Sequence, residues 1–220
     1  MKKIILAVLI LLRCLCLAQQ PVEQAFRFGF SSGAEFQTLH LGLLAHRPGD
    51  PVLDTRRTGG AGASIGVWGA WQVLPALSVR PGLHITHTSG ALRFVWEDGQ
   101  ESGWRYPFTE IEIPVHFVLR NRFRRLPLQA LILFGGRLSW NLSAAPDNPP
   151  VHLLAQRAGF DIGVGAGLRW GKWNIQPEMV YSYGLNNSHD FQNTRYDWTV
   201  GSILRDRLSI RLLFGRLHDE

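Results

Sequence analysis

Strict alternation of apolar and polar residues runs through almost the whole chain after Ala25. Successive side chains of a β-strand point to opposite faces, so a period of two predicts strands with one apolar and one polar face. The sharpest example places Ile111 and Ile113 on one face, and Glu110 and Glu112 on the other. No segment shows a convincing helical period. The sequence therefore predicts an all-β fold.

The strands and their connections repeat in a regular order. The apolar faces of the eight predicted strands cover residues 26–30, 65–71, 77–85, 111–119, 130–138, 160–168, 173–181 and 208–214. Short connections are expected around Pro75, at 120–127 and at 171–172, and long polar ones at 37–58, 89–103, 142–156 and 185–201. Strict alternation of short and long connections is typical of outer-membrane barrels. We predict an eight-stranded antiparallel up-and-down transmembrane β-barrel with short periplasmic turns and long extracellular loops.

The choice of outer face separates a membrane barrel from a soluble one. A lipocalin-like barrel also has eight alternating strands, but it directs its apolar face inward around a ligand. Here, aromatic residues gather near the strand ends, as in the interfacial girdles of membrane barrels. These residues are Trp71, Trp140, Trp170, Trp173, Tyr181 and Tyr183. The polar face is also rich in glycine, which suits a crowded interior. The pattern favours the membrane barrel, with the soluble binder as the alternative.

Charged residues recur on the predicted inner face. They are Arg80, Glu110, Glu112, Arg137, Asp161, Arg169, Glu178 and Arg211. The interior of an eight-stranded barrel is just wide enough to be filled by side chains, and an unpaired ion there would be costly. We therefore expect these residues to form a network of ion pairs that plugs the lumen, which disfavours a porin function.

The N-terminus has the features of a secretory signal peptide. Lys2 and Lys3 precede a short apolar run at 4–12, and the small residue Ala18 stands at the expected cleavage site. We predict a signal peptide at 1–18 and an outer-membrane β-barrel domain at 19–220. The chain's two cysteines, Cys14 and Cys16, lie inside the signal. The exported chain is thus expected to use no disulfide.

The chain is basic, with a net charge of +6 and a pI near 9.9. Its arginines are scattered among strands and do not form one basic helix or stripe, so nucleic-acid binding is not expected. One local cluster, Arg120, Arg122, Arg124 and Arg125, falls in a predicted periplasmic turn. It is either a solvated turn or a contact for an acidic partner or the cell wall.

Few residues suggest catalysis or metal binding. His84 and His87 are three apart on a strand and point to opposite faces, so they cannot bind one metal. His116 could approach His84 inside the barrel, where two packed histidines are the simpler interpretation. His87 with Ser89 is the only pair that could serve a lipid-acting enzyme on the outer face, and nothing orients it. We expect no catalytic residue, no metal and no cofactor.

Several segments have a recognisable pattern. They are Glu110-Ile-Glu-Ile-Pro114, Leu133-Phe-Gly-Gly-Arg137, Gly159-Phe-Asp-Ile-Gly-Val-Gly-Ala-Gly167, Ile175-Gln-Pro-Glu-Met-Val-Tyr-Ser-Tyr-Gly-Leu-Asn186 and Ser202-Ile-Leu-Arg-Asp-Arg207. Together they resemble the PorT family of outer-membrane barrels of Bacteroidetes, over roughly the whole chain after the signal. The resemblance implies association with the type IX secretion system and brings no catalytic residue.

The resemblance and the residue pattern together give one expected function and two alternatives. We expect a non-enzymatic barrel in the bacterial outer membrane that is an accessory component of type IX protein secretion. Its partners would be the lipid bilayer and other secretion-system proteins. The first alternative is a PorT-like barrel that binds a ligand or adhesin through its extracellular loops. The second is an outer-membrane enzyme that acts on lipids.

Overall fold

The structure is a computed structural model that describes residues 26–43, 52–96, 98–122, 128–143, 151–191 and 200–216. The predicted signal peptide at 1–18 lies outside these residues and stays a prediction. None of the described residues belongs to a helix long and apolar enough to cross a membrane.

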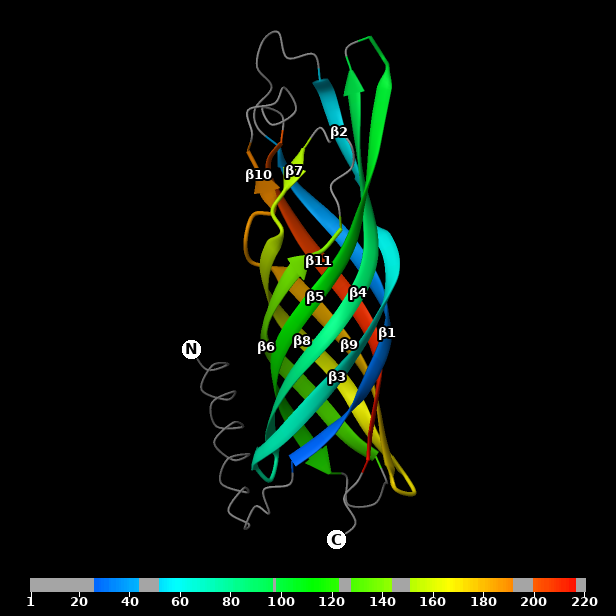
Figure 1. Cartoon of the computed structure of the whole chain (residues 1–220), viewed down its shortest axis with the longest axis vertical. Coiled ribbons are helices and arrows are strands. Elements are labelled where there is room, and N and C mark those ends of the chain that lie inside the picture. Colours follow the sequence, from blue (N-terminus) through cyan, green and yellow to red (C-terminus); the bar gives the residue numbers. More distant parts are fainter. Residues whose placement is uncertain are drawn as a thin grey trace, which may run out of the picture.

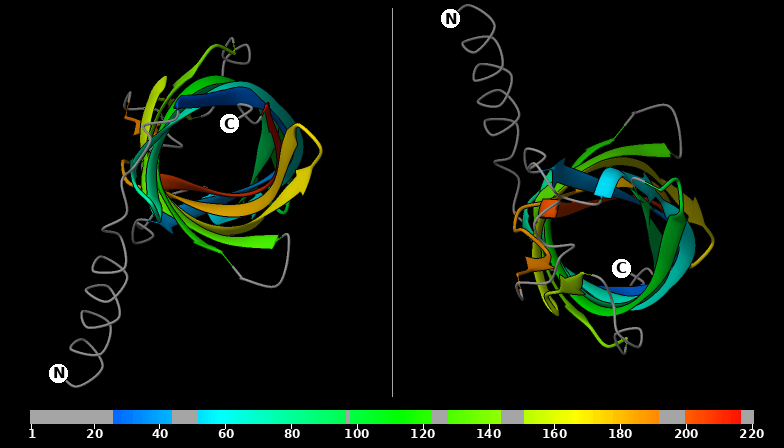
Figure 2. Two further views of the ribbon diagram at one scale, coloured as in Figure 1. Left: turned by 90° about the horizontal axis from the view of Figure 1, so that it is seen from below. Right: turned by 90° about the horizontal axis from the view of Figure 1, so that it is seen from above.

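Eight long strands form a closed antiparallel ring, as predicted (Figures 1 and 2). They are β1 (Phe26–Leu43), β3 (Gly60–Leu74), β4 (Leu77–Trp96), β5 (Glu101–Arg122), β6 (Leu128–Asn141), β8 (Gln156–Trp170), β9 (Trp173–Gly184) and β11 (Val200–Arg216). Each pairs with the next strand in this order, and β1 pairs with β11 to close the ring. The closing register runs from Gly29 opposite Gly215 to Leu43 opposite Val200. Closure leaves no unpaired sheet edge within the ring.

The two ends of the barrel differ in their connections. At one end, which we call the turn end, Pro75 and Ala76 join β3 to β4, and Gly171 and Lys172 join β8 to β9. Gly171 adopts φ of 57°, a conformation that residues with a Cβ rarely adopt. The first residue of β1 and the last of β11 also lie at the turn end (Figure 1). We call the opposite end, which carries the longer connections, the loop end.

The strands extend further into the loop end than the sequence predicted. Residues 89–103 were expected as a long polar connection, yet β4 continues to Trp96 and β5 begins at Glu101. The prediction missed that apolar residues still alternate there, since Leu92 and Phe94 are buried. Three short strands add to this end, namely β2 (Val52–Thr58), β7 (His152–Leu153) and β10 (His189–Asp190). Strand β2 pairs with the upper part of β4, above the part that pairs with β3.

The outer face of the barrel is apolar, so the prediction of which face is outside is confirmed. Ile65 and Ile85, which are opposite each other on β3 and β4, have exposed fractions of 64% and 51%. Phe117 and Phe134 stack on the outer face with ring centroids 5.5 Å apart. Trp170, at the turn end, is 75% exposed. A soluble barrel would bury these side chains, so the lipocalin-like alternative is wrong for this fold.

The interior of the loop end is filled by an apolar cap. The cap consists of the buried residues Leu39, Leu92, Phe94, Tyr106, Phe108, Val151, Val200 and Ile203. They come from β1, β4, β5 and β11 and from the segment before β7. The cap closes the lumen above the charged side chains described below.

Candidate functional site

The predicted charged residues face the lumen. Arg80, Glu110, Glu112, Arg137, Asp161, Glu178 and Arg211 are all buried, with exposed fractions of 4% or less. The side chain of Arg169 lies outside the described part of the structure. Alternation places these residues inside because their strand neighbours carry the apolar face turned to lipid.

The centre of the lumen is a carboxylate pair bridged by one arginine. Arg207 donates two parallel hydrogen bonds to Glu112, with Nη1 to Oε1 at 2.5 Å and Nη2 to Oε2 at 2.6 Å. Its Nε lies 3.2 Å from Oε2 of Glu35. Ser64 and Ser209 also donate to Glu35. All these side chains are fully buried or nearly so. Such a bidentate pair, with two parallel hydrogen bonds from one arginine to one carboxylate, is a strong form of ion pair.

A second cluster lies where the charged layer meets the apolar cap. Arg205 donates from Nη1 to Glu110 at 3.0 Å and from Nη2 to Gln37 at 2.8 Å. Arg157 donates to the other carboxylate oxygen of Glu110 at 3.3 Å. The Arg205 guanidinium also lies 3.6 Å from the centre of the Phe108 ring, a cation–π contact. Through Arg205, the charged side chains and the apolar cap are therefore in direct contact.

A third cluster lies toward the turn end. Arg80 donates two hydrogen bonds to Glu178 at 2.6 and 2.7 Å. Nε2 of His116 lies 2.9 Å from Oδ2 of Asp161, whose other oxygen is 3.7 Å from Nη2 of Arg137. Arg137 also lies 3.8 Å from Glu112, which links this cluster to the centre. The sequence predicted that opposite charges pair inside the barrel, and the structure brings these side chains together.

The sequence pattern did not reveal four members of the network. Glu35, Arg157, Arg205 and Arg207 were not among its candidates, although each is buried and paired. A signal was present for all four, because the alternation continues beyond 26–30 on the first strand, before 208–214 on the last strand and before 160–168 on β8. Following it forward to Glu35 and back to Arg157 and Arg205 would have found them.

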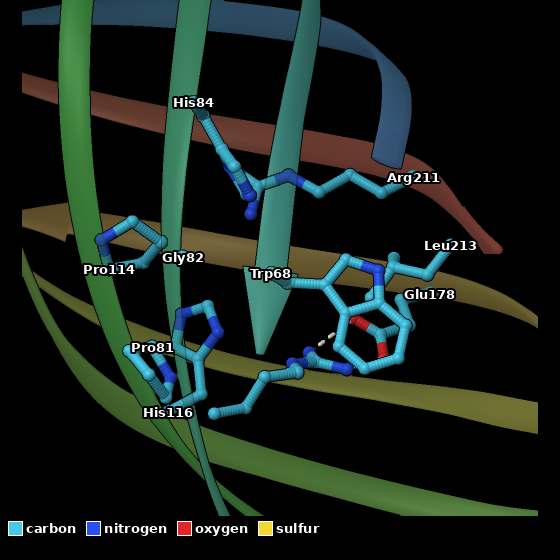
Figure 3. A pocket seen from close by; sticks show the side chains of 10 residues that line it. Trp68, Pro81, Gly82, His84, Pro114, His116, Glu178, Arg211 and Leu213 are labelled. Carbon is cyan, nitrogen blue, oxygen red and sulfur yellow. Dashed lines mark hydrogen bonds and ion pairs between the residues drawn. The ribbon is translucent and has the colours of Figure 1, made fainter. Parts of the chain in front are cut away.

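The two lumen histidines line a small cavity with Arg80, Glu178 and Arg211 (Figure 3). The cavity measures about 10 Å³, the space of one water molecule. Nε2 of His84 lies 3.3 Å from the Ser31 hydroxyl, while His116 contacts Asp161. Across the described residues, no group of three or more His, Cys, Asp or Glu side chains could hold a metal ion. These contacts fit two histidines packed as part of the lumen.

The network fills the lumen and leaves little space for water. Glu35, Glu112, Arg205 and Arg207 are each 1% exposed or less, whereas charges that line a water-filled channel remain wetted. Burying an ion costs several kcal/mol, and pairing plus hydrogen bonding must offset that cost. Chemically, the arrangement is a rigid ionic plug beneath an apolar cap.

The outer face carries two histidine clusters. Nδ1 of His87 lies 2.9 Å from the Thr109 hydroxyl, so its described partner is a threonine and not Ser89. Nε2 of His40 lies 3.1 Å from Asp206, a cluster that sequence analysis missed.

Asp206 lies where the pairing between β9 and β11 ends, while β9 stays paired with β8. It also accepts hydrogen bonds from the Tyr181 hydroxyl at 2.6 Å and from the Gly184 amide at 3.1 Å. Pairing between β9 and β11 begins next to this point, at Ser182 opposite Arg207. The carboxylate thus satisfies the backbone at the end of β9.

The predicted basic turn is described only in part. Arg120 faces the lumen at the turn end, and its backbone amide donates to the Ala76 carbonyl at 2.8 Å. The side chain of Arg122 and all of Arg124 and Arg125 lie outside the described residues. The structure therefore places Arg120 in the lumen wall, and a contact between the cluster and an acidic partner or the cell wall stays a prediction.

Comparison with known proteins finds no matching family model and no matching curated protein. Among solved structures, the outer membrane protein OprG from Pseudomonas aeruginosa matches at a TM-score of 0.50 and 11% identity, covering 87% of this chain and 93% of that chain. Neisserial surface protein A (NspA) matches at a TM-score of 0.44 and 13% identity, covering 84% and 95%. The N-terminal β-barrel domain of Pseudomonas aeruginosa OprF matches at 0.34 and 9%, covering 84% and 98%. The likeness to OprG is one of fold, that of an outer-membrane β-barrel.

Proposed function

We propose that this chain is a non-enzymatic β-barrel of the bacterial outer membrane and an accessory component of type IX protein secretion. The observation that carries the proposal is the filled lumen, in which Arg207, Glu112 and Glu35 are fully buried. A barrel plugged in this way does not conduct solutes, so its useful surfaces are its two ends. An anchored barrel of this kind suits a role in holding partner proteins at the membrane.

The secretion role is supported by the resemblance of the strand motifs to the PorT family. Those motifs include Glu110 and Glu112, Arg137, and the segment from Ser202 to Arg207. In the structure, the members of these motifs that belong to the ionic plug are Glu110, Glu112, Arg137, Arg205 and Arg207. The resemblance therefore falls on the residues that build the closed interior.

The proposal also implies an orientation of the barrel in the outer membrane. Outer-membrane barrels place short turns in the periplasm and longer loops outside the cell. The turn end, with Gly171 and Lys172, would then face the periplasm, and the β4–β5 hairpin around Asp98 would project from the cell.

A deletion strain tests the proposal directly. We expect deletion of the gene to leave type IX cargo inside the cell, and the wild-type gene to restore cargo to the medium. The barrel variant Trp170→Phe, which keeps an aromatic side chain at an exposed position, is the matched control and should restore secretion fully. Normal secretion by the deletion strain would reject the secretion role and leave the barrel fold unaffected.

A second candidate is binding of a ligand or adhesin at the loop end. The observation that favours it is the three-stranded sheet of β2, β4 and β5, which projects beyond the ring (Figure 1). Phe94 and Phe108 anchor this sheet to the apolar cap, so it is a supported surface. Its test is adhesion of whole cells carrying Arg93→Ala and Arg105→Ala, which change exposed side chains of the hairpin. Lost adhesion with intact secretion would favour this candidate.

A further inference from the structure

The described lumen carries an excess of positive charge. The carboxylates that face the described lumen are Glu35, Glu110, Glu112, Asp161 and Glu178. The arginines that face it are Arg27, Arg80, Arg120, Arg137, Arg157, Arg205, Arg207 and Arg211. Each of the five carboxylates already contacts an arginine. The described lumen therefore holds three more guanidinium groups than carboxylates.

Arg120, at the turn end of the lumen, is the arginine on which the following inference rests. Its Nε and Nη2 atoms are buried and have no hydrogen-bond partner among the described residues. The charged groups that act on it are Arg27, Arg80 and Glu178. Glu178 is occupied, because both of its oxygens accept hydrogen bonds from Arg80. A buried guanidinium beside two other cations is costly unless an anion compensates it.

A hydroxyl donor stands next to Arg120 on the same face. Arg120 lies opposite Ala76, and Ser78 is the next residue of β4 that faces the lumen. The Ser78 hydroxyl is buried and has no hydrogen-bond partner in the described part of the chain. Two unpartnered donors, one charged and one neutral, thus face the same mouth of the barrel. This combination is typical of sites for oxyanions.

We propose that Arg120 and Ser78 form a binding site for an oxyanion, a phosphate or carboxylate group, at the turn end of the lumen. The lipid headgroups of the bilayer surround the barrel from outside, whereas these donors face inward, so the anion enters from the aqueous side. The two sources of such a group are free phosphate and the acidic side chains of a protein segment. The site does not depend on the secretion role, since it rests only on the lumen's own charges.

The test is calorimetry on the folded protein in detergent, with inorganic phosphate in one arm and an acetylated tetra-aspartate peptide in the other. We expect saturable binding of at least one probe, weakened about tenfold or more by Arg120→Gln, which corresponds to about 1.4 kcal/mol. Binding should also weaken as salt rises. Phosphate binding would identify a free ion as the ligand, and binding of the peptide alone would identify an acidic protein segment.

The controls separate loss of the site from loss of the fold. Arg93→Gln removes an exposed arginine at the loop end and should leave binding unchanged. Ser78→Ala removes only a hydroxyl, so it keeps the test valid if Arg120→Gln does not fold, and we expect about threefold weaker binding. Absence of binding to the wild-type protein, or equal binding by wild type and both site variants, would overturn the proposal. Because the assay uses purified protein, its outcome is separate from that of the secretion test.

Discussion

Replacing Glu112 with glutamine removes the central charge of the plug and keeps the shape of the side chain. Glu112 is fully buried and accepts hydrogen bonds at 2.5 and 2.6 Å from Arg207. An amide offers one acceptor oxygen, so at least one of these bonds is lost and the buried guanidinium loses its opposite charge. Breaking a buried ion pair costs about 3–5 kcal/mol. Oε2 of Glu35 still lies 3.2 Å from Nε of Arg207, so we expect a cost at the low end of this range, about 3 kcal/mol.

A double-mutant cycle isolates the interaction energy between Glu112 and Arg207. Glu112→Gln and Arg207→Met are compared with the double variant by urea unfolding in lipid vesicles, with the shift of the folded band on unboiled gels as a second readout. We expect the double variant to be less destabilised than the sum of the single ones, by about 2 kcal/mol. The matched control is Glu101→Gln, which breaks a 3.2 Å pair with Arg93 whose side chains are 60% and 45% exposed, and should cost under about 1 kcal/mol. Equal costs for Glu112→Gln and Glu101→Gln, or strict additivity in the cycle, would refute the buried network.

Three further changes test other parts of the structure by the same unfolding assay. Gly135→Ala would bring a Cβ within 2.0 Å of the Val115 carbonyl oxygen and should lower the free energy of unfolding by about 1–3 kcal/mol. In the control Gly103→Ala, the nearest atom to the new Cβ is 4.0 Å away, so this variant should be near neutral. Equal effects of the two variants would contradict the close approach of the strands at Gly135. Ile65→Arg, on the lipid face, should cost about 2–4 kcal/mol in vesicles, and Trp170→Arg near the turn end about 1 kcal/mol or less; a tolerated Ile65→Arg would deny that this face meets lipid. Phe108→Ala should cost about 3–5 kcal/mol, because it opens a cavity in the apolar cap and removes the aromatic ring that contacts Arg205. A cost below about 1 kcal/mol would mean that the cap is not packed.

Much of the fold could be predicted because the membrane and the crowded lumen act on every strand alike. A residue such as Ile113 faces lipid and its neighbour Glu112 faces the lumen, so the pattern appears directly in the sequence. Tight turns left an equally clear signal, as at Gly171. The alternation therefore located the ring, its outer face and seven of its buried charged residues.

The remainder depended on contacts between distant strands. Arg207 and Glu112 are far apart in sequence, and the alternation places each inside without saying which acid meets which base. The upper strands were missed because the pattern reverses at the loop end, where the inward residues Leu92 and Phe94 are apolar and Arg93 between them is exposed. Asp206 was missed because its partners His40 and Tyr181 come from other strands.

The central claim is that the polar face forms a packed lumen and the apolar face meets lipid. Single cysteines in a chain that begins at Gln19, without Cys14 and Cys16, test it most directly. Leu138→Cys lies on the apolar face, and Ser139→Cys beside it faces the lumen, where the native serine is 1% exposed. In folded protein in vesicles, we predict that a lipid-soluble maleimide labels Leu138→Cys, whereas Ser139→Cys reacts only after unfolding. Rapid labelling of Ser139→Cys by a water-soluble maleimide, with Leu138→Cys protected, would contradict the account.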